Sequence, residues 1–282
     1  MKLALGTVQF GMNYGIASAG RPDIDSIKDI LQKAFEENID ILDTSSGYGD
    51  AEEILGKVIC RLNEPFRIVS KYPQGDHNVE TIFNVTLRHL GVSKLYGYLL
   101  HHFEVYRENP SVWEDFEKLK QNGKVEKIGF SIYSPEELEL LLNRNVDFDL
   151  IQFPYNIFDR QFEPYLQLLK EKNVEVHTRS VFLQGLFFKD IKLLPSKLLP
   201  LGGYLSELHQ YCAIHNISIE QLALNYVLNE DKIDRVLIGI DNLEQLKANL
   251  YTAGQNISET DISFINSINI KEKKLLNPAN WK

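Results

Sequence analysis

The sequence predicts a (β/α)8 TIM barrel that forms a single domain over residues 1–282. Strand-like apolar runs alternate with helical patterns through the whole chain, which is typical of a parallel sheet with helical crossovers. The alternation continues without a shift in composition, a Gly/Ser linker or an internal repeat, which favours one closed barrel. The length of 282 residues, 44% of them hydrophobic, is sufficient to bury a large core. An open doubly wound sheet is the alternative.

The predicted strands are short and spread along the whole chain. They are expected at residues 2–7, 39–44, 67–71, 95–101, 127–131, 149–153, 174–179 and 235–239. Between them, apolar residues at helical spacing predict amphipathic helices. Several helix starts have a candidate N-cap residue with a polar partner three residues later, as in a capping box. These caps are Asp50 with Glu53, Ser134 with Glu137, Ser218 with Gln221, and Ser258 with Asp261.

Charge and composition narrow the partners. The net charge of -9 argues against nucleic acid or a membrane surface as the main partner, so a small molecule is expected. Cys60 and Cys212 lack the spacing of a disulfide or zinc site and look like packing residues in a reducing compartment, so no metal is expected. The N-terminus does not resemble a signal peptide, and no stretch reaches membrane-spanning length. We therefore expect a cytoplasmic protein, and its oligomeric state stays open.

Polar side chains follow three consecutive predicted strands. Asp43 ends the second strand, and Tyr48 lies in the loop after it. Lys71 ends the third strand, and His101 and His102 end the fourth. Active sites of (β/α)8 barrels lie at the C-terminal ends of the strands, and strand alternation points Asp43, Lys71 and His101 inward. We expect these groups to meet over the mouth of the barrel.

Together these side chains suit the reduction of a carbonyl group. A phenol has a pKa of about 10, and a neighbouring ammonium lowers it, so Lys71 is expected to make Tyr48 a better proton donor. Asp43 is expected to hold Lys71 charged and in place, because an unpaired ammonium in a dry pocket is costly. His101 is expected to orient the carbonyl oxygen by donating a hydrogen bond, or to help relay the proton.

Simpler interpretations exist for each of these residues. Asp43 also suits a turn before a helix, Tyr48 a packed aromatic ring in a loop, and Lys71 an exposed surface position. His102 is the alternative to His101 as the functional histidine. Taken together, these interpretations do not explain why all of these polar residues follow the C-terminal end of a predicted strand.

Around these residues the sequence resembles the aldo-keto reductases, and the resemblance spans nearly the whole chain. "DTSSGYGDAEEILG" is similar to the family pattern "DTA..YG.SE..LG", Lys71 to the Lys of "..SK", and His101 to the His of "..L.H". Downstream, "GKVEKIGFS", "DLIQFPYN", "HTRSVFLQGLF" and "RVLIGIDNLEQLKANL" resemble later strands and cofactor segments of the family. The resemblance implies that Tyr48 is the general acid, that Lys71 and Asp43 tune it, and that NADPH lies extended across the strand ends.

The resemblance also implies which residues bind the cofactor. They are Gly6, Thr7, Asp43, Ser131, Gln152, Arg179, Ser180, Phe182, Gln184, Gly185, Leu186, Gly239, Gln245 and Asn249. Two positions depart from the family pattern: Ile132 replaces the Asn that follows Ser131, and Arg179 stands where many members place an aromatic ring. Arg179 is expected to stack on the nicotinamide, to meet a phosphate, or to pair with Asp149 or Glu175.

The sequence specifies the choice of cofactor and substrate less closely than it specifies the candidate catalytic residues. The segment "GIDNLEQ", which would border the adenosine, lacks the Lys or Arg that NADPH-specific relatives often carry. Asp241 would repel a 2′-phosphate if it pointed inward, so NADH is the alternative to NADPH. The chain begins close to the first strand and ends soon after "NPANW", which implies short loops and an open pocket for a bulky or sugar-like compound.

The sequence thus predicts an NAD(P)H-dependent aldo-keto reductase that converts an aldehyde or ketone to an alcohol. Two other classes stay open. A redox sensor or regulatory partner with slow turnover would bind the nicotinamide cofactor without needing the acid Tyr48. Another barrel enzyme, such as an isomerase, would bind no nicotinamide at all.

Overall fold

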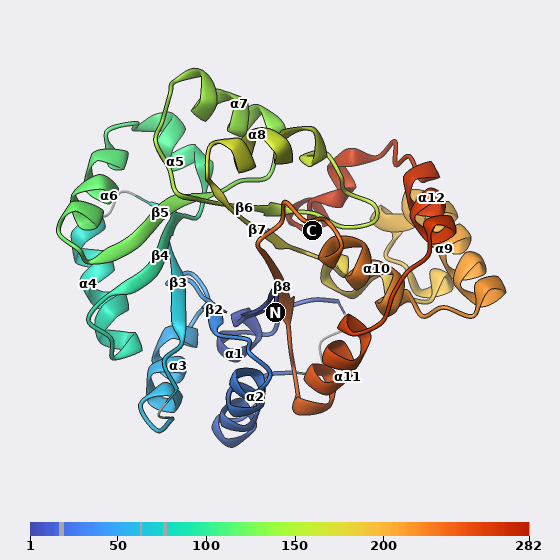
Figure 1. The fold of residues 1–282 in the computed structure, drawn as a ribbon, viewed down its shortest axis with the longest axis horizontal. Coiled ribbons are helices and arrows are strands. Elements are labelled where there is room, and N and C mark those ends of the chain that lie inside the picture. The colour runs from blue at the N-terminus through green and yellow to red at the C-terminus, as the bar shows by residue number, and fades with distance from the viewer. Residues whose placement is uncertain (17–19, 63, 76–77, 282) are drawn as a thin grey trace.

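The strands form a closed barrel in sequence order, from β1 to β8 (Figure 1). The structure is a computed structural model that describes residues 1–16, 20–62, 64–75 and 78–281. The strands are β1 (Leu3–Gly6), β2 (Ile41–Asp43), β3 (Arg67–Tyr72), β4 (Leu95–Leu100), β5 (Val125–Ser131), β6 (Leu150–Pro154), β7 (Glu175–Arg179) and β8 (Arg235–Gly239). All pairs are parallel, and β1 closes the sheet on β8 with Leu5 opposite Ile238. The predicted barrel is confirmed, and the open sheet is excluded.

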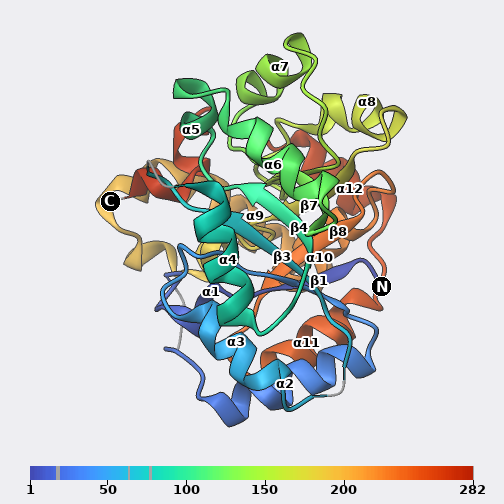
Figure 2. The same ribbon diagram turned by 90° about the vertical axis from the view of Figure 1, so that its left-hand side faces the viewer.

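Helices surround the barrel (Figures 1 and 2). The α-helices are α1 (Val8–Gly11), α2 (Ile24–Glu36), α3 (Ala51–Ile59), α4 (Val79–Leu90), α5 (Phe103–Glu108), α6 (Val112–Gln121), α7 (Pro135–Asn143), α8 (Leu166–Glu171), α9 (Gly202–His215), α10 (Ile219–Leu228), α11 (Leu243–Ala253) and α12 (Glu259–Ser267). Short 3₁₀ helices are η1 (Glu163–Tyr165), η2 (Leu183–Phe188), η3 (Ile191–Leu193), η4 (Ser196–Leu201), η5 (Lys273–Leu276) and η6 (Pro278–Trp281). Helices α2, α3 and α11 lie side by side along one side of the barrel, opposite α7 and α8.

The core has one part inside the barrel and a larger part between the strands and the helices. The inside cluster consists of Ala4, Ile41, Val69, Leu99, Leu150 and Leu237. It includes the inward positions that strand alternation predicts on β2, β3 and β4. Asp43, Lys71 and His101 each come two residues after one of these apolar positions. They therefore lie at the C-terminal rim of the barrel.

Three of the four predicted helix caps are present. Ser134 and Ser258 each form a capping box with the residue three positions later, and the Ser218 side chain accepts a hydrogen bond from the Gln221 amide. The prediction for Asp50 is wrong, because its side chain makes no cap hydrogen bond. Its backbone lacks the extended conformation of a good cap, and its carboxylate instead accepts a hydrogen bond from Arg21 at 2.6 Å.

The two cysteines differ from each other. Cys212 is buried in α9, as expected for a packing residue, whereas Cys60 is exposed just after the end of α3, so that the packing prediction is wrong for Cys60. The position of each cysteine, and not its residue type, decides whether it is buried, since Cys60 lies past the last buried turn of its helix. Within the described ranges, no helix combines the length and the hydrophobicity needed to cross a lipid bilayer.

Candidate active site

A close contact between two backbone segments positions Tyr48. Helix α1 packs so tightly on the turn after β2 that a Cβ atom on Gly11 would lie 1.8 Å from the carbonyl oxygen of Tyr48. Gly49 has a φ of 59°, in the left-handed region, and a Cβ atom there would lie 2.6 Å from the Gly11 carbonyl oxygen. Glycine is therefore required on both sides of the contact. The "GYG" motif directs the phenol of Tyr48 into the mouth of the barrel.

Asp43 and Lys71 form a buried ion pair beneath this phenol. The Lys71 Nζ atom lies 2.5 Å from Asp43 Oδ1, 2.9 Å from the carbonyl oxygen of Thr44 and 3.4 Å from the Tyr48 hydroxyl. The second carboxylate oxygen of Asp43 accepts a hydrogen bond from Gln152 at 2.8 Å. Burial lowers the pKa of Lys71, and the adjacent Asp43 carboxylate opposes that shift. The arrangement aims the ammonium group at the phenol oxygen.

One electrostatic expectation is wrong. Lys71 was expected to lower the pKa of Tyr48, but the pKa is raised well above its ordinary value. Burial is the main cause and the charge of Asp43 adds to it, whereas the positive charge of Arg179 acts in the opposite direction. Asp43 neutralises the nearby ammonium and lies close enough to disfavour a phenolate. The phenol thus keeps its proton at neutral pH.

His101 is held as a neutral imidazole against Tyr48. Its ring meets the Tyr48 ring edge-on, with centroids 5.5 Å apart, whereas the His102 ring contacts His101 at 4.7 Å. Burial lowers the pKa of His101 to about 2, and the charge of Lys71 contributes. Of the two histidines considered from the sequence, His101 is therefore the one beside the phenol.

Ser45 determines which nitrogen of His101 carries the proton. Its buried hydroxyl lies 3.0 Å from His101 Nδ1 and accepts a hydrogen bond from the Gly47 amide at 3.0 Å. Among the described residues these are its two partners, so the hydroxyl proton is satisfied only if it is donated to Nδ1. The imidazole then carries its own proton on Nε2. The sequence signal was Ser45 itself, which replaces the Ala of the family pattern.

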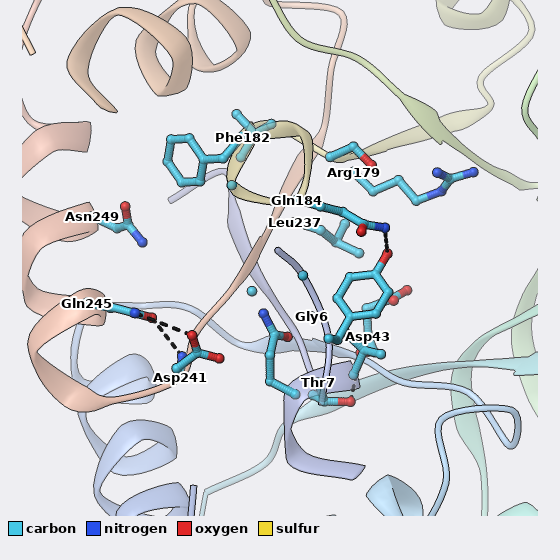
Figure 3. Close-up of a pocket in the computed structure, with 18 of the residues that line it drawn as sticks. Gly6, Thr7, Asp43, Arg179, Phe182, Gln184, Leu237, Asp241, Gln245 and Asn249 are labelled. Atoms are coloured by element: carbon cyan, nitrogen blue, oxygen red, sulfur yellow. Dashed lines mark hydrogen bonds between the residues drawn. The ribbon is translucent and has the colours of Figure 1, made fainter. Parts of the chain in front are cut away.

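A cavity of about 370 Å³ lies over the C-terminal strand ends beside Tyr48 (Figure 3). The predicted cofactor residues that line it are Gly6, Thr7, Asp43, Gln152, Arg179, Ser180, Phe182, Gln184, Gly185, Gly239, Gln245 and Asn249. Ser131 and Leu186 are buried and do not belong to its lining. Lys71 and His101 also stay outside the lining, and they contact the Tyr48 side chain that forms part of the wall.

Several lining residues were missed by the sequence reasoning. They are Val8, Gln9, Tyr14, Gly15, Phe188, Glu220, Leu237 and Ala248. Leu237 could have been found, because it lies two residues before Gly239 on the same face of β8. Glu220 and Ala248 lie in helices far along the chain, where no local pattern marks them. Phe188 is exposed and lines the cavity.

The loop after β7 reaches across to the segment that follows α1. Gln184 has a φ of 52° and Gly185 one of 86°, so the chain reverses tightly here. The Gln184 side chain donates a hydrogen bond to the Tyr14 hydroxyl at 2.6 Å, and the backbone carbonyl oxygen of Gln184 accepts one from the Ile16 amide at 3.1 Å. These contacts join two cavity-lining loops that are far apart in the sequence.

The lining residues fit a nicotinamide dinucleotide. The buried Oε1 atom of Gln152 has no hydrogen-bond partner among the described residues, while its Nε2 atom is bound to Asp43. Such an orphaned acceptor suits the amide nitrogen of a carboxamide. Figure 3 shows Asn249 and Gln245 on the opposite side of the cavity from Asp43. The cavity thus offers polar groups at both ends of an extended ligand.

The expected pairing of Arg179 with an acid is wrong. Asp149 pairs with Lys120 and Glu175 with Lys127, so both acids are engaged elsewhere. The Arg179 guanidinium instead lies over a ring of Tyr133, 3.9 Å from its centroid, and donates to the Ile132 carbonyl oxygen at 3.0 Å. Both partners lie at the barrel rim, because Ile132 and Tyr133 directly follow the last residue of β5.

Fold and site together describe a closed (β/α)8 barrel with a cavity at its C-terminal strand ends, and with an Asp43–Lys71 ion pair beside the phenol of Tyr48 in the cavity wall. The sequence profile of the Aldo/keto reductase family matches residues 2–270. The chain belongs to this family of oxidoreductases, whose members use nicotinamide cofactors.

The chain is similar to several named proteins at low identity. It is 26% identical over 264 residues to the uncharacterized oxidoreductase YqkF of Bacillus subtilis, covering 84% of this chain and 86% of that protein. It is 24% identical over 309 residues to the NADH-specific methylglyoxal reductase of Escherichia coli, covering 94% and 93%. The holo structure of aldo-keto reductase AKR11C1 from Bacillus halodurans has a TM-score of 0.75 at 21% identity, covering 97% and 95%. The structural similarity to AKR11C1 supports the (β/α)8 barrel fold.

Proposed function

We propose that the protein reduces an aldehyde or ketone to an alcohol with Tyr48 as the proton donor. The observation that carries this proposal is the buried Asp43–Lys71 pair, whose ammonium contacts the hydroxyl of a tyrosine in the cavity wall. A structural ion pair would not need a phenol at the cavity. The raised pKa of Tyr48 keeps the proton on the phenol until a carbonyl oxygen gains negative charge.

Each residue has a separate task in this proposal. The reduced nicotinamide, when bound, supplies a hydride to the carbonyl carbon. Tyr48 donates its proton to the carbonyl oxygen, and Lys71 donates a hydrogen bond to the phenol oxygen as negative charge forms there. The Nε2–H group of His101 orients the carbonyl oxygen. Gln152 holds the carboxamide of the cofactor with its unpaired oxygen.

We also propose NADH as the preferred cofactor, in place of the NADPH that the family resemblance implies. Asp241 and Glu220 both line the cavity, and among its described lining residues the single Lys or Arg is Arg179, which lies away from Gln245 and Asn249 (Figure 3). A carboxylate accepts a hydrogen bond from a 2′-hydroxyl but repels a 2′-phosphate. The similar methylglyoxal reductase is named as NADH-specific, which supports the same choice.

The substrate we propose is a small or sugar-like carbonyl compound. Two relatives are named as reductases of such compounds, methylglyoxal and L-glyceraldehyde 3-phosphate. The second is 25% identical to this chain over 285 residues, covering 84% of the chain and 80% of that protein. Tyr48 lines the cavity, so its phenol faces the space in which a compound of this kind would bind.

Paired titrations with NADH and NADPH, each with and without a panel of aldehydes, test these proposals. Oxidation of bound cofactor by an aldehyde supports the reductase. Binding without oxidation would favour the redox sensor, and absence of nicotinamide binding would favour another barrel enzyme. The two carboxylates that we place at the adenosine end, the half-buried Asp241 and the exposed Glu220, should favour NADH by about 1–2 kcal/mol. A thousand-fold preference for NADPH would contradict the cofactor assignment.

A further inference from the structure

Arg179 is a cation in the cavity wall. Within the described part of the chain, it forms no salt bridge with a carboxylate. Its contacts are the Tyr133 ring and one backbone carbonyl oxygen, that of Ile132. A guanidinium has five N–H donors, so most of them stay available to a ligand.

The guanidinium is held in place rather than left mobile. Tyr133 covers one of its faces, and the hydrogen bond to the Ile132 carbonyl oxygen fixes its rotation. Its edge is the part that can bind a carboxylate or phosphate with two parallel hydrogen bonds. Little conformational freedom is lost when an anion binds to a group that is already oriented.

Arg179 lies at the reaction end of the cavity. Figure 3 shows its side chain extending away from Gln245 and Asn249, toward the side of the cavity where Asp43 lies. Burial raises the pKa of Tyr48 and lowers that of His101; the positive charge of Arg179 opposes the first shift and adds to the second, which places the guanidinium within electrostatic reach of the proton donor. An anionic group bound there would therefore belong to a molecule that also reaches Tyr48.

One acidic residue lies within reach of the charge of Arg179. Burial raises the pKa of Asp159 to about 6, and Arg179 opposes this shift without forming an ion pair with it. The Asp159 carboxylate accepts a long hydrogen bond from Gln161 at 3.4 Å instead. Asp159 thus leaves the edge of the guanidinium available.

We propose that Arg179 binds an anionic group, a carboxylate or a phosphate, on the carbonyl substrate. The proposal rests on the reductase function and narrows its substrate class to acidic aldehydes or ketones. The anion would bind at the edge of the guanidinium while the carbonyl oxygen faces Tyr48. Arg179 then determines specificity by contacting the substrate directly.

Two matched pairs of aldehydes test this. One pair is para-carboxybenzaldehyde and its methyl ester, and the other is glyceraldehyde phosphate and glyceraldehyde. We expect a preference in kcat/KM for the charged member of at least one pair, about 10- to 100-fold. The pair that shows it identifies the anion. Arg179→Gln should remove most of this preference, and Arg179→Lys should retain part of it.

Arg144→Gln is the matched control, because Arg144 is an exposed arginine that also lies over a tyrosine ring, that of Tyr106, at 5.6 Å. It does not line the cavity, so the preference should be unchanged. An equal preference in the wild type and Arg179→Gln would overturn the proposal. So would weaker NADH binding in Arg179→Gln without a change in preference, since Arg179 would then serve a cofactor phosphate.

A binding measurement separates this proposal from the reductase function. Calorimetry with para-(hydroxymethyl)benzoate and its methyl ester requires no turnover. Tighter binding of the acid that is lost in Arg179→Gln supports the anion site even if neither aldehyde is reduced, in which case the reductase proposal alone would fail. Equal binding of acid and ester, together with equal kcat/KM for glyceraldehyde phosphate and glyceraldehyde, would overturn the anion site.

Discussion

The Ser45 hydroxyl lies 3.0 Å from Nδ1 of His101 and also accepts a hydrogen bond from the Gly47 amide. This pair of contacts selects the imidazole tautomer with its proton on Nε2. Replacing Ser45 with Ala should let both tautomers form, because a neutral hydrogen bond of about 1 kcal/mol holds the selected one. We expect kcat to fall roughly 2- to 10-fold.

Nitrogen NMR of His101 gives the direct readout of this prediction, since protonated and unprotonated ring nitrogens differ in chemical shift. Nδ1 should be unprotonated in the wild type and partly protonated in Ser45→Ala. A wild-type spectrum with the proton on Nδ1 would contradict the assignment, whatever the activity of the variant.

Tyr48→Phe should abolish most of the turnover while the cofactor still binds. The ring can pack as before, but the transferable proton is gone, and general acid catalysis typically contributes ~10²–10⁴-fold. The measurements are aldehyde reduction and a titration with NADH on the same preparation. Turnover close to that of the wild type would exclude Tyr48 as the acid.

Asp43→Asn should shift the pH dependence of reduction. Burial lowers the pKa of Lys71 and the Asp43 carboxylate opposes this, so without the carboxylate the pKa of Lys71 falls further. The alkaline decline in activity should then begin at lower pH, and the rate should fall roughly 10- to 100-fold. Turnover is measured against pH for both enzymes.

Lys71→Met should be more severe than Asp43→Asn, because it removes the ammonium directly. Since both residues act on Tyr48 through one ion pair, the double variant should cost less than the sum of the single losses. NADH binding by each variant is the control for folding. Additive losses would show that the Asp43 carboxylate acts independently of Lys71.

His101 should make the protein less stable in acid. Its pKa is lowered to about 2 in the folded chain, against about 6.5 when unfolded. Above about pH 6.5 the ring is neutral in both states, whereas below it only the unfolded chain takes up the proton. The free energy of unfolding should therefore drop by up to about 1.4 kcal/mol per pH unit from this residue as the pH falls.

Urea unfolding of the wild type and His101→Asn, at several pH values below neutrality, measures this contribution. The variant should lose stability less steeply as the pH falls. Parallel pH profiles for the two proteins would mean that His101 is protonated in the folded state as readily as in the unfolded one.

Gly11→Ala should displace Tyr48 or destabilise the fold. The added Cβ atom would lie 1.8 Å from the Tyr48 carbonyl oxygen. That oxygen is a backbone atom and the Cβ position is set by the backbone, so neither atom can rotate away. Overpacking of this kind typically costs about 1–3 kcal/mol. Gly203→Ala in α9 is the matched control, because nothing lies within 4 Å of its added Cβ atom. Equal thermal stability and turnover in the two variants would contradict the close contact.

The sequence by itself determined the barrel, its strands and the residues at its rim. Alternation along β2 and β3 fixes which side chains point inward, because successive side chains of a strand point to opposite faces. Asp43 and Lys71 could be placed at the rim for this reason, before any contact between them was known. The family resemblance added Gln152 and most of the cavity lining, since an ordered set of motifs contains more information about position in the fold than local periodicity does.

Only the tertiary structure decided how these groups affect one another. The raised pKa of Tyr48 depends on the balance between burial, Asp43 and Arg179, which come from separate elements. The contact between Tyr14 and Gln184 joins residues 170 positions apart. The Arg179 guanidinium contacts the Tyr133 ring rather than pairing with Asp149 or Glu175. Local patterns set the direction of a side chain relative to its own backbone, whereas distances between segments arise when the barrel closes. Electrostatic shifts and ligand contacts depend on those distances.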